Sequence, residues 1–393
     1  MDRFWRPAWV EVNIDAIQHN IQEVQRLIGK NIDIIGVIKG DAYGHGAVEM
    51  ARQLSNFGVK RLAVATVDEG VELRENGVTI PVLVLGYTGI SQLAAAVEHD
   101  LSMTLHLKEM AEKISDIARH RNKIAKVHIK VNTGMNRIGI LPGEAKDFFL
   151  SVQEMAGLKI EGIFTHFASA GQKDKTDANR QLKLFKEVIA GIKEISKEEF
   201  IVHTANSGAT MEMPDAYFDA VRPGRLIYGL YPYPKVKKVI HLQPALQVKC
   251  EIAQINQIPA GEGVGYEAIF RPSHQTTTAT LPIGFTDGVV SKRTIDQILV
   301  IIGGQKRKVV AVCADMCMVD LGSNPTHAQP GDMVTLIGTQ DGETITVDEI
   351  AGPSKQSLGG VLSHLSRRLP RIYLKKNKPY LARLPFEKYE NID

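Results

Sequence analysis

Apolar runs alternate with helix-period segments through about the first 230 residues of the chain. Short runs rich in Ile, Val and Leu are typical of buried strands, and longer stretches with apolar residues three or four positions apart are typical of helices packed by one face. The predicted strands cover residues 34–38, 62–67, 82–85, 101–105, 126–131, 160–165, 200–204 and 218–222. The predicted helices between them include residues 107–119, 142–155 and 178–196. A further helix precedes the first strand, with one apolar face and a cap at Asn13 or Asp15, and that face is formed by Ile14, Ile17, Ile21, Val24 and Leu27.

Eight strand–helix repeats of this length predict an α/β fold, a closed parallel (β/α)8 barrel of the TIM type. An open doubly wound sheet is the alternative, but no Gly-x-Gly-x-x-Gly turn opens a first helix to support it. After Pro234 the pattern changes to Val-, Ile- and Thr-rich segments separated by Gly, Pro and Asp turns, which predicts a mostly antiparallel β domain. These segments cover residues 245–257, 276–283, 297–302, 308–313 and 332–337, with only residues 354–367 expected to be helical. We therefore expect a barrel domain over residues 8–235 and a β domain over residues 236–393, joined near residues 230–240.

Composition narrows the class of protein. A length of 393 residues is too great for one compact core, and 44% hydrophobic and 23% charged residues are ordinary for a globular protein. A net charge of +3 implies neither a nucleic-acid nor a membrane partner. Residues 1–7 lack an apolar signal core, and no later stretch is long enough to span a bilayer.

The three cysteines form no disulfide framework, and Cys313 and Cys317 lack the partner ligands of a zinc site. We expect no metal and a cytoplasmic location.

Lys39 is the first candidate for chemistry. It follows the apolar run Ile34–Ile38 and precedes a turn rich in small residues, Gly40 to Gly46, that contains Tyr43. A lysine at such a place either reaches past the strand end into solvent or serves a chemical purpose, because lysines are seldom buried alone. Desolvation lowers the pKa of the amine and makes it nucleophilic toward an aldehyde such as that of pyridoxal 5'-phosphate (PLP), with which it forms a Schiff base.

Other polar residues follow later strands of the predicted barrel. In a parallel barrel the carboxyl ends of all strands meet on one face, where active sites are built. Each of these side chains alone has an ordinary structural explanation, such as a hydrogen-bonded histidine or a rim arginine, but their shared position indicates a site. They are Lys39, Arg137, His166, Asn206, Ser207 and Arg222.

The motifs around these residues make the chain similar to the alanine racemases, two-domain PLP enzymes of bacterial type, over nearly its whole length. Seven motifs match the family in order and spacing. They are the Lys39 segment, Lys-Val-Asn-Thr-Gly-Met-Asn-Arg (130–137), Thr-His-Phe-Ala (165–168), Ala-Asn-Ser (205–207), Val-Gly-Tyr-Glu-Ala (264–268), Pro-Ile-Gly-Phe-Thr-Asp-Gly (282–288) and Cys-Ala-Asp-Met-Cys-Met (313–318).

The resemblance implies a two-base racemisation. Lys39 would hold PLP and act as one acid/base group at the substrate Cα, and Tyr266 would act on the opposite face. Tyr266 would come from a partner subunit, so the resemblance implies a homodimer with shared active sites. Arg222 would hydrogen-bond the pyridine nitrogen of PLP, and His166 would orient Arg222 and Tyr266.

The resemblance also implies the binding residues. Arg137 would contact the substrate carboxylate and the cofactor phenolate, and Lys130, which is carbamylated in some relatives, would steady Arg137. Ala314 and Asp315 would line the substrate pocket from the partner side. The residues that would bind the cofactor at or beside its phosphate are Tyr43, Asn206, Ser207, Gly224 and Arg225.

Four positions depart from the family pattern. Ala314 stands where many relatives carry methionine, Phe285 where a tyrosine of the access corridor is common, and Arg225 where an aliphatic residue is usual. Counted back from Pro370, Gly359 occupies the place of a tyrosine that reaches the phosphate and the substrate methyl group. Ala314 and Gly359 remove volume beside the substrate, which favours a wider pocket unless local rearrangement fills the gap.

The function expected from the sequence is the interconversion of L- and D-alanine, with bacterial cell-wall precursor supply as its use. A racemase of serine or of larger amino acids is the alternative that the wider pocket favours. A PLP decarboxylase of the same two-domain plan would place an acid where Arg222 stands. A non-catalytic PLP carrier would lack the β domain that bears Tyr266.

Overall fold

The computed structural model describes residues 6–234, 236–289, 295, 297–323, 327–385 and 389–391. Contacts divide the chain into two compact units. We call residues 16–42 and 47–244 the barrel unit, and residues 1–15, 43–46 and 245–393 the sheet unit.

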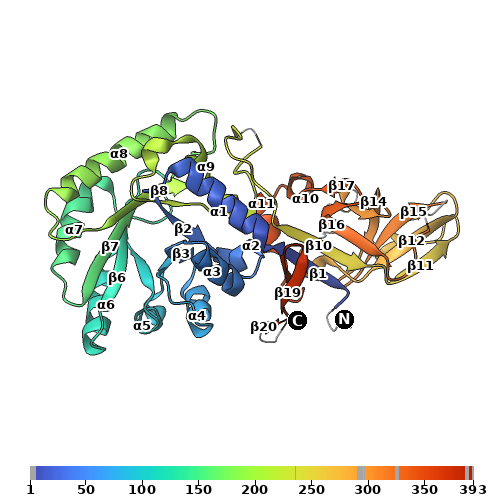
Figure 1. Cartoon of the computed structure of the whole chain (residues 1–393), viewed down its shortest axis with the longest axis horizontal. Helices are drawn as coiled ribbons and strands as arrows, with labels where there is room; N and C mark the ends of the chain where they lie inside the picture. The colour runs from blue at the N-terminus through green and yellow to red at the C-terminus, as the bar shows by residue number, and fades with distance from the viewer. Residues whose placement is uncertain are drawn as a thin grey trace. The chain divides into compact units, whose positions relative to one another are not determined.

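The barrel unit is a closed barrel of eight parallel strands with helices outside them (Figure 1). Each strand of the barrel pairs in parallel with its neighbours, and the pairing of β2 with β9 closes the barrel. Its strands are β2 (Asp33–Val37), β3 (Arg61–Val64), β4 (Val82–Val84), β5 (Ser102–Leu105), β6 (Ala125–Lys130), β7 (Leu158–Phe164), β8 (Ile201–Asn206) and β9 (Ala220–Arg222). Its helices are α1 (Ile14–Ile28), α2 (Lys39–Tyr43), α3 (Ala47–Asn56), α4 (Val67–Glu75), α5 (Leu93–Glu98), α6 (Lys108–His120), α7 (Ala145–Gln153), α8 (Thr176–Lys193) and α9 (Ser207–Glu212). The expected eight-stranded barrel is confirmed.

The sheet unit is built on a twelve-stranded sheet. All of its strand pairs are antiparallel except β1 with β18, so the expected mostly antiparallel domain is also confirmed. Its strands are β1 (Ala8–Asn13), β10 (Leu246–Glu251), β11 (Gln254–Ile258), β12 (Thr276–Leu281), β13 (Leu299–Ile302), β14 (Gln305–Val312), β15 (Cys317–Gly322), β16 (Met333–Gln340), β17 (Glu343–Ile345), β18 (Arg371–Lys375), β19 (Lys378–Arg383) and β20 (Tyr389–Asn391). The α-helices among its described residues are α10 (Val347–Ser354) and α11 (Leu358–Ser363).

The expected barrel boundary at residue 8 differs from the structure. Residues 8–13 form β1, which pairs antiparallel with β10 and parallel with β18 in the sheet unit. Four of the six residues of β1 are buried, and Trp9 packs in a cluster with Ile372, Ala382 and Leu384 of the sheet unit. The chain therefore begins in the sheet unit and enters the barrel unit through α1.

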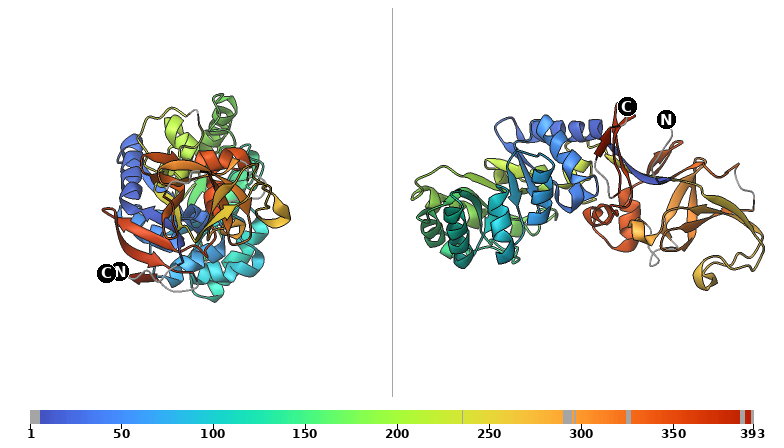
Figure 2. Two further views of the ribbon diagram at one scale, coloured as in Figure 1. Left: turned by 90° about the vertical axis from the view of Figure 1, so that its right-hand side faces the viewer. Right: turned by 90° about the horizontal axis from the view of Figure 1, so that it is seen from below.

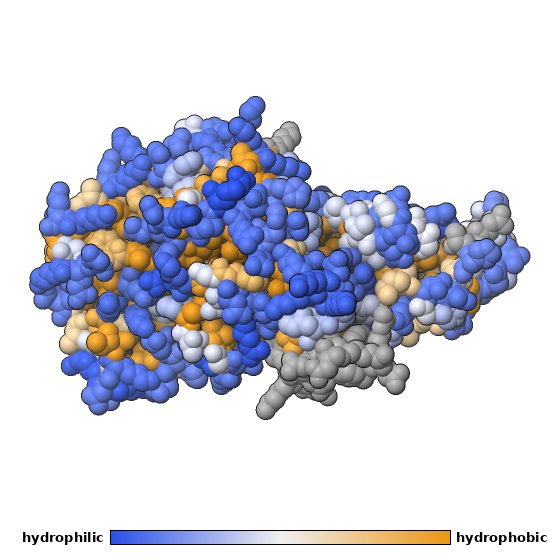
Figure 3. All heavy atoms as spheres, in the orientation of Figure 1, coloured by the Kyte–Doolittle hydropathy of each residue, from blue (hydrophilic) through white to orange (hydrophobic). Residues whose placement is uncertain are grey.

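The two units have apolar interiors. The helices of the barrel unit lie outside its strands in two further views (Figure 2), and hydrophilic side chains cover most of the face drawn in Figure 3. Within the described residues, no helix is both long and apolar enough to cross a membrane.

Candidate active site

Lys39 stands at the carboxyl end of β2, where the backbone takes an unusual course. Gly40, Asp41 and Ala42 have φ of 64°, 53° and 54° and ψ of 46° to 47°, so the segment turns as a left-handed helix. Each non-glycine residue in this conformation costs roughly 1–2 kcal/mol. Such strain persists only where surrounding contacts hold it, and it gathers at functional sites.

Glu69 of α4 holds this turn in place. One carboxylate oxygen accepts the N–H of Gly40 at 2.6 Å, and the other accepts the N–H of Ala65 at 2.6 Å. Burial, reinforced by the charges of Arg137 and Arg225, lowers the pKa of Lys39 below its usual value. A lysine amine with a lowered pKa is uncharged, and so nucleophilic, over a wider pH range.

Arg222, at the end of β9, is buried with a relative exposure of 3%. Its Nη1 donates to Nδ1 and to the carbonyl oxygen of His203, both at 2.7 Å. Its Nη2 donates to the carbonyl oxygens of Thr165 and Thr204 at 2.8 and 3.0 Å, and lies 3.3 Å from Nδ1 of His166. A guanidinium has five N–H groups. Within the described part of the chain, the Nε–H of Arg222 is the one that no protein acceptor takes.

The two histidines beside Arg222 are uncharged. Burial, aided by the charge of Arg222, lowers the pKa of both His166 and His203 well below the usual value. Burial also lowers the pKa of Arg222 to about 9, which leaves it cationic at neutral pH. The mouth of the barrel thus presents a fixed cation surrounded by neutral acceptors.

Asn206, Ser207 and Gly224 form a small cluster of hydrogen-bonding groups at the ends of β8 and β9. Asn206 caps α9 by accepting the N–H groups of Gly208 and Ala209 at 3.1 Å. The hydroxyl of Ser207 accepts the N–H of Gly224 at 3.0 Å, so the two adjacent turns are tied together.

Arg225 follows this cluster and donates to the carbonyl oxygen of Pro232 at 2.6 Å. Helix termini and turns of this kind offer N–H groups to anions.

Lys130 is the last residue of β6, and Arg137 lies in the loop that follows this strand. The Arg137 side chain is exposed, and the Lys130 side chain is buried with an exposure of 2%. Burial, followed by the charges of Arg137 and Arg222, lowers the pKa of Lys130 to about 8. No carboxylate among the described residues pairs with the Lys130 amine, whose nitrogen lies 5.4 Å from the centre of the Phe164 ring.

Three predicted site residues lie in the sheet unit. Tyr266 is 71% exposed and opens the short 3-10 helix η5 (Tyr266–Ala268) after β11, in a turn where Glu267 and Ala268 have φ of 59° and 51°. Ala314 and Asp315 lie in the turn between β14 and β15. Asp315 accepts a hydrogen bond from Arg368 at 2.6 Å, and Thr286 donates to the Ala314 carbonyl oxygen at 2.8 Å.

Tyr43 and Gly359 also belong to the sheet unit. The segment Tyr43–Gly46 is tied to it by Arg371, a fully buried side chain whose Nε donates to the carbonyl oxygen of Gly44 at 3.1 Å. Gly359 is buried near the start of α11. The residue that precedes α11, Ser357, caps it by accepting the N–H of Gly360 at 3.0 Å.

The sequence matches the family "Alanine racemase, N-terminal domain" over residues 12–232 and "Alanine racemase, C-terminal domain" over residues 245–373. It is 38% identical over 381 residues to alanine racemase 2 of Caldanaerobacter subterraneus subsp. tengcongensis, with 95% of this chain and 97% of that protein covered. The chain belongs to the alanine racemase family. Enzymes of this family are isomerases that depend on PLP.

Solved structures agree with this assignment. The chain is similar to an alanine racemase of Clostridium difficile, with a TM-score of 0.93, 35% identity, and coverage of 98% of this chain and 100% of that one. It is also similar to a histidine racemase of Leuconostoc mesenteroides, with a TM-score of 0.85, 26% identity, and coverage of 95% and 99%. The shared architecture therefore serves amino acids of very different size.

The residues of the barrel mouth fit the family's cofactor. Lys39 offers an amine with a lowered pKa, as a Schiff base requires. Arg222 offers one unused N–H for a ring nitrogen. The Ser207 hydroxyl, whose oxygen accepts the N–H of Gly224, keeps its own proton as a donor that suits a phosphate.

Several residues that build the site carried no assigned role in the sequence analysis. Glu69 was detectable as the last residue of the capping box Thr66-x-x-Glu69, although not as the support of the Lys39 turn. Nothing in the sequence marks Arg371, because its partners are backbone carbonyl oxygens, which every residue has. His128, Glu161 and His203 lie inside or at the start of predicted strands, and only the strand pairing brings them together.

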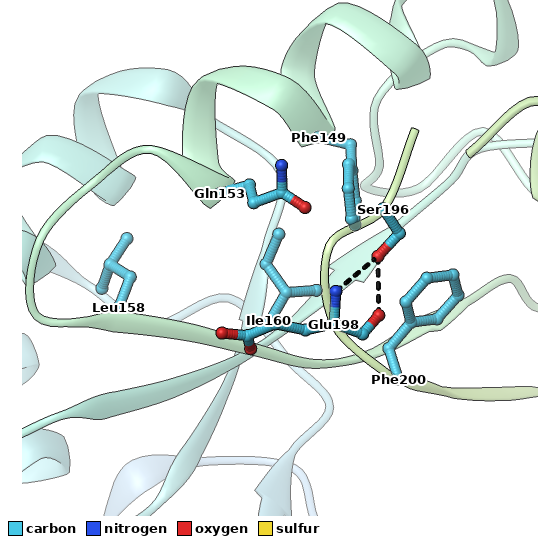
Figure 4. A pocket seen from close by; sticks show the side chains of 7 residues that line it. All are labelled: Phe149, Gln153, Leu158, Ile160, Ser196, Glu198 and Phe200. Carbon is cyan, nitrogen blue, oxygen red and sulfur yellow. Dashed lines mark hydrogen bonds between the residues drawn. The ribbon is translucent and has the colours of Figure 1, made fainter. Parts of the chain in front are cut away.

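Hollows also lie away from the barrel mouth. A cavity of about 30 Å³, room for about one water, is lined by α7, β7 and the segment before β8 (Figure 4). An open cleft of about 930 Å³ lies at the amino-terminal ends of the barrel strands, where it is lined by Asp33, Lys60, Arg61 and Glu161 among others.

Proposed function

We propose that the protein interconverts L- and D-alanine with PLP as cofactor, using Lys39 and Tyr266 as the two acid/base groups. Family membership supports the reaction class. The observation that carries the proposal is Arg222, a buried cation with a single N–H left over after the protein's own hydrogen bonds are made. That donor suits an unprotonated ring nitrogen.

PLP, when bound, supplies an electron sink that acidifies the Cα–H bond of an amino acid. Lys39 then removes or returns the proton on one face of that carbon, since its amine has a lowered pKa and is ready to accept a proton. A racemase must place a second proton carrier on the opposite face. The phenol of Tyr266 is proposed for that position.

Arg222 sets the strength of the electron sink. An arginine donates a hydrogen bond without handing over its proton, and with a pKa of about 9 it stays charged at neutral pH. Arg222 would therefore leave a bound ring nitrogen unprotonated and the electron sink weak, which would favour return of the proton to Cα over transamination. The arginine distinguishes the proposed racemase from a PLP decarboxylase of the same two-domain plan, which would place an acid at the ring nitrogen. Among the described residues, no carboxylate is hydrogen-bonded at the position of Arg222.

The remaining site residues are proposed to bind the charged groups of the cofactor and the substrate. Ser207, Gly224, Arg225 and Asn206 are proposed for the phosphate turn, together with Tyr43. Arg137, which is exposed at the barrel mouth, is proposed to bind the substrate carboxylate with its planar fork. His166 is proposed to orient Arg222, from which it lies 3.3 Å away, and the partner's phenol.

Lys130 is proposed to be carbamylated. A buried amine with a pKa of about 8 is about half uncharged near pH 8, and an uncharged amine reacts with carbon dioxide. The carbamate would replace a buried positive charge by a negative one and would attract Arg137. This resolves the like-charge repulsion between the two residues.

Tyr266 is proposed to act in the active site of a partner subunit. Exposed large hydrophobic residues are costly on a lone chain, and several lie in the same part of the sheet unit as Tyr266. They include Ile269, Phe285 and Met316, with exposures of 58%, 41% and 47%. A homodimer with shared sites would bury such residues, and family enzymes are dimers.

The residues proposed to set the size of the substrate are Ala314, Asp315 and Gly359. The similarity to proteins named alanine racemase supports alanine as the substrate. Acceptance of a larger amino acid such as serine is the second candidate, supported by the small residues at 314 and 359 and by the similarity to a histidine racemase. A cytoplasmic location is proposed because Cys250, Cys313 and Cys317 are unpaired thiols.

The test is to incubate the PLP-loaded protein with single L-amino acids in heavy water, and to read both deuterium at Cα and chirality. Alanine racemisation with deuterium uptake is the expected result. Decarboxylation products would support the decarboxylase plan, and no exchange beyond that of free PLP would support a carrier. Faster turnover of serine or histidine than of alanine would transfer the assignment to the second candidate.

A further inference from the structure

Two buried histidines extend the contacts of Arg222 through the interior of the barrel. His203 Nε2 lies 2.9 Å from Nδ1 of His128, and Nε2 of His128 lies 3.2 Å from a carboxylate oxygen of Glu161. His128 and His203 are 1% and 0% exposed. The chain of contacts, which we call the relay, runs from Arg222, at the carboxyl end of β9, to Glu161 in the middle of β7.

Hydrogen-bond chemistry gives this relay a single direction. Arginine only donates, so Nδ1 of His203 must accept and its Nε2 must carry the proton. His203 then donates to Nδ1 of His128, and the Nε2–H of His128 donates to Glu161. Both histidines are therefore neutral Nε2–H tautomers.

Glu161 is the fixed end of the relay. It also accepts the hydroxyl of Ser102 at 2.7 Å and lies 3.5 Å from Nη1 of Arg61. Although burial opposes ionisation, these donors and His128 hold the pKa of Glu161 well below its usual value. Its side chain is 16% exposed, and it lines the open cleft at the amino-terminal ends of the strands.

The barrel makes room for the relay at a specific place. A Cβ atom on Gly162 would lie 2.3 Å from Nδ1 of His128 and 2.6 Å from its Cε1. The Phe164 ring stacks on the His203 ring with centres 4.9 Å apart and planes inclined by 13°, and it also lies 5.2 Å from Cζ of Arg222. Packing thus fixes both the position and the tilt of the rings.

We propose that His203, His128 and Glu161 are positioning residues which fix the orientation of Arg222 and stabilise its charge. The proposal rests on the proposed function, in which Arg222 donates to the cofactor ring. Arg222 has no carboxylate of its own among the described residues, and the relay connects it to one through two polarisable rings. The occupied Nη groups leave the Nε–H as the donor that faces the cofactor.

Matched substitutions at His128 test the relay. In His128→Gln the amide oxygen can still accept from His203 and the amide N–H can still donate to Glu161, whereas His128→Leu interrupts the relay. We expect His128→Leu to lower kcat about tenfold with little change in KM, since the buried N–H of His203 loses its acceptor. His128→Gln should stay within about twofold of wild type.

Two further variants separate positioning from general loss of structure. Glu161→Gln removes only the charge. It should lower kcat about threefold to fivefold, because a hydrogen bond to a charged acceptor is stronger than one to a neutral acceptor. Asp33→Asn is the control, because Asp33 lines the same cleft and pairs with Lys60 at 2.8 Å but lies outside the relay. The His128→Leu and Glu161→Gln variants should also convert more cofactor to its amine form per turnover, which a purely structural defect would not do.

A direct readout does not depend on turnover. Holoenzyme carrying 15N-imidazole histidine should show protonated Nε2 and unprotonated Nδ1 for His128 and His203. A protonated Nδ1 on His203 in the wild-type enzyme would overturn the proposal. The proposal would also be overturned if both His128→Leu and Glu161→Gln kept the wild-type kcat and converted no more cofactor to its amine form than the wild type. If the His128→Leu variant fails to fold, the comparison of kcat between Glu161→Gln and Asp33→Asn decides whether the proposal holds. A wild-type protein that racemises nothing would refute the proposed function while leaving the tautomer result to stand or fall by itself.

Discussion

Replacing Glu69 by glutamine should loosen the left-handed turn that carries Lys39. The carboxylate accepts two N–H groups at 2.6 Å, from Gly40 and Ala65. Hydrogen bonds to a charged group contribute about 1.5–3 kcal/mol each. The glutamine oxygen can replace one of them, but its NH2 group faces the other N–H, so the net loss is about 2 kcal/mol.

This loss falls on a segment that is already strained, so it should appear as weaker retention of the cofactor. A change of about 2 kcal/mol corresponds to about thirtyfold in an equilibrium constant. The assay is dialysis of the holoenzyme against increasing volumes of PLP-free buffer, with the visible absorbance of the Schiff base as readout. Glu75→Gln is the control, because Glu75 lies exposed on the same helix. Equal retention of PLP by Glu69→Gln and Glu75→Gln would refute the reasoning.

Three further predictions concern charge and space. Because burial lowers the pKa of Lys130 to about 8, a folded chain without the carbamate loses this proton before the unfolded chain does. Its free energy of unfolding in carbon-dioxide-free buffer should rise between pH 8 and 10 relative to that of Lys130→Met, and parallel pH profiles would contradict the buried amine. Arg222→Glu should lower racemisation at least about a hundredfold and increase transamination, because an acid strengthens the electron sink, and intact turnover would refute the assigned role. Gly46→Ala should lower the free energy of unfolding, measured by chemical denaturation, by about 3 kcal/mol, since the φ of Gly46 is 92° and a Cβ there would lie 2.0 Å from the Tyr373 hydroxyl. Gly58→Ala is the control and should lower it by only about 1 kcal/mol, because the φ of Gly58 is 86° but no atom lies within 4 Å of the added Cβ.

The barrel could be predicted from the sequence because each of its strands is an apolar run and each connection is a helix with one apolar face. The sheet unit was harder to predict, because its strands pair over long sequence distances. Residues 8–13 could be read as apolar, but their partners are β10 and β18, hundreds of residues away. Strands β18 and β19 each begin and end with a charged residue, so pattern alone did not reveal them.

The positions of Lys39 and Arg222 could be predicted from the sequence, because each is a polar residue at the end of an apolar strand. What holds those residues was not foreseeable. The positive φ of Asp41 and Ala42 has no sequence signal, since neither is glycine. His128 and His203 stand in neighbouring positions of the barrel interior only because β6, β7 and β8 pair in a particular register.

The central claim is that each active site takes Lys39 from one subunit and Tyr266 from the partner. Lys39→Ala and Tyr266→Phe variants can be mixed after mild dissociation, reassociated with PLP, and assayed for alanine racemisation. Each variant alone should be inactive. The mixture should recover up to about a quarter of wild-type activity, since half of the dimers are mixed and each mixed dimer has one intact site. No recovery, from chains shown to have exchanged, would contradict the shared site.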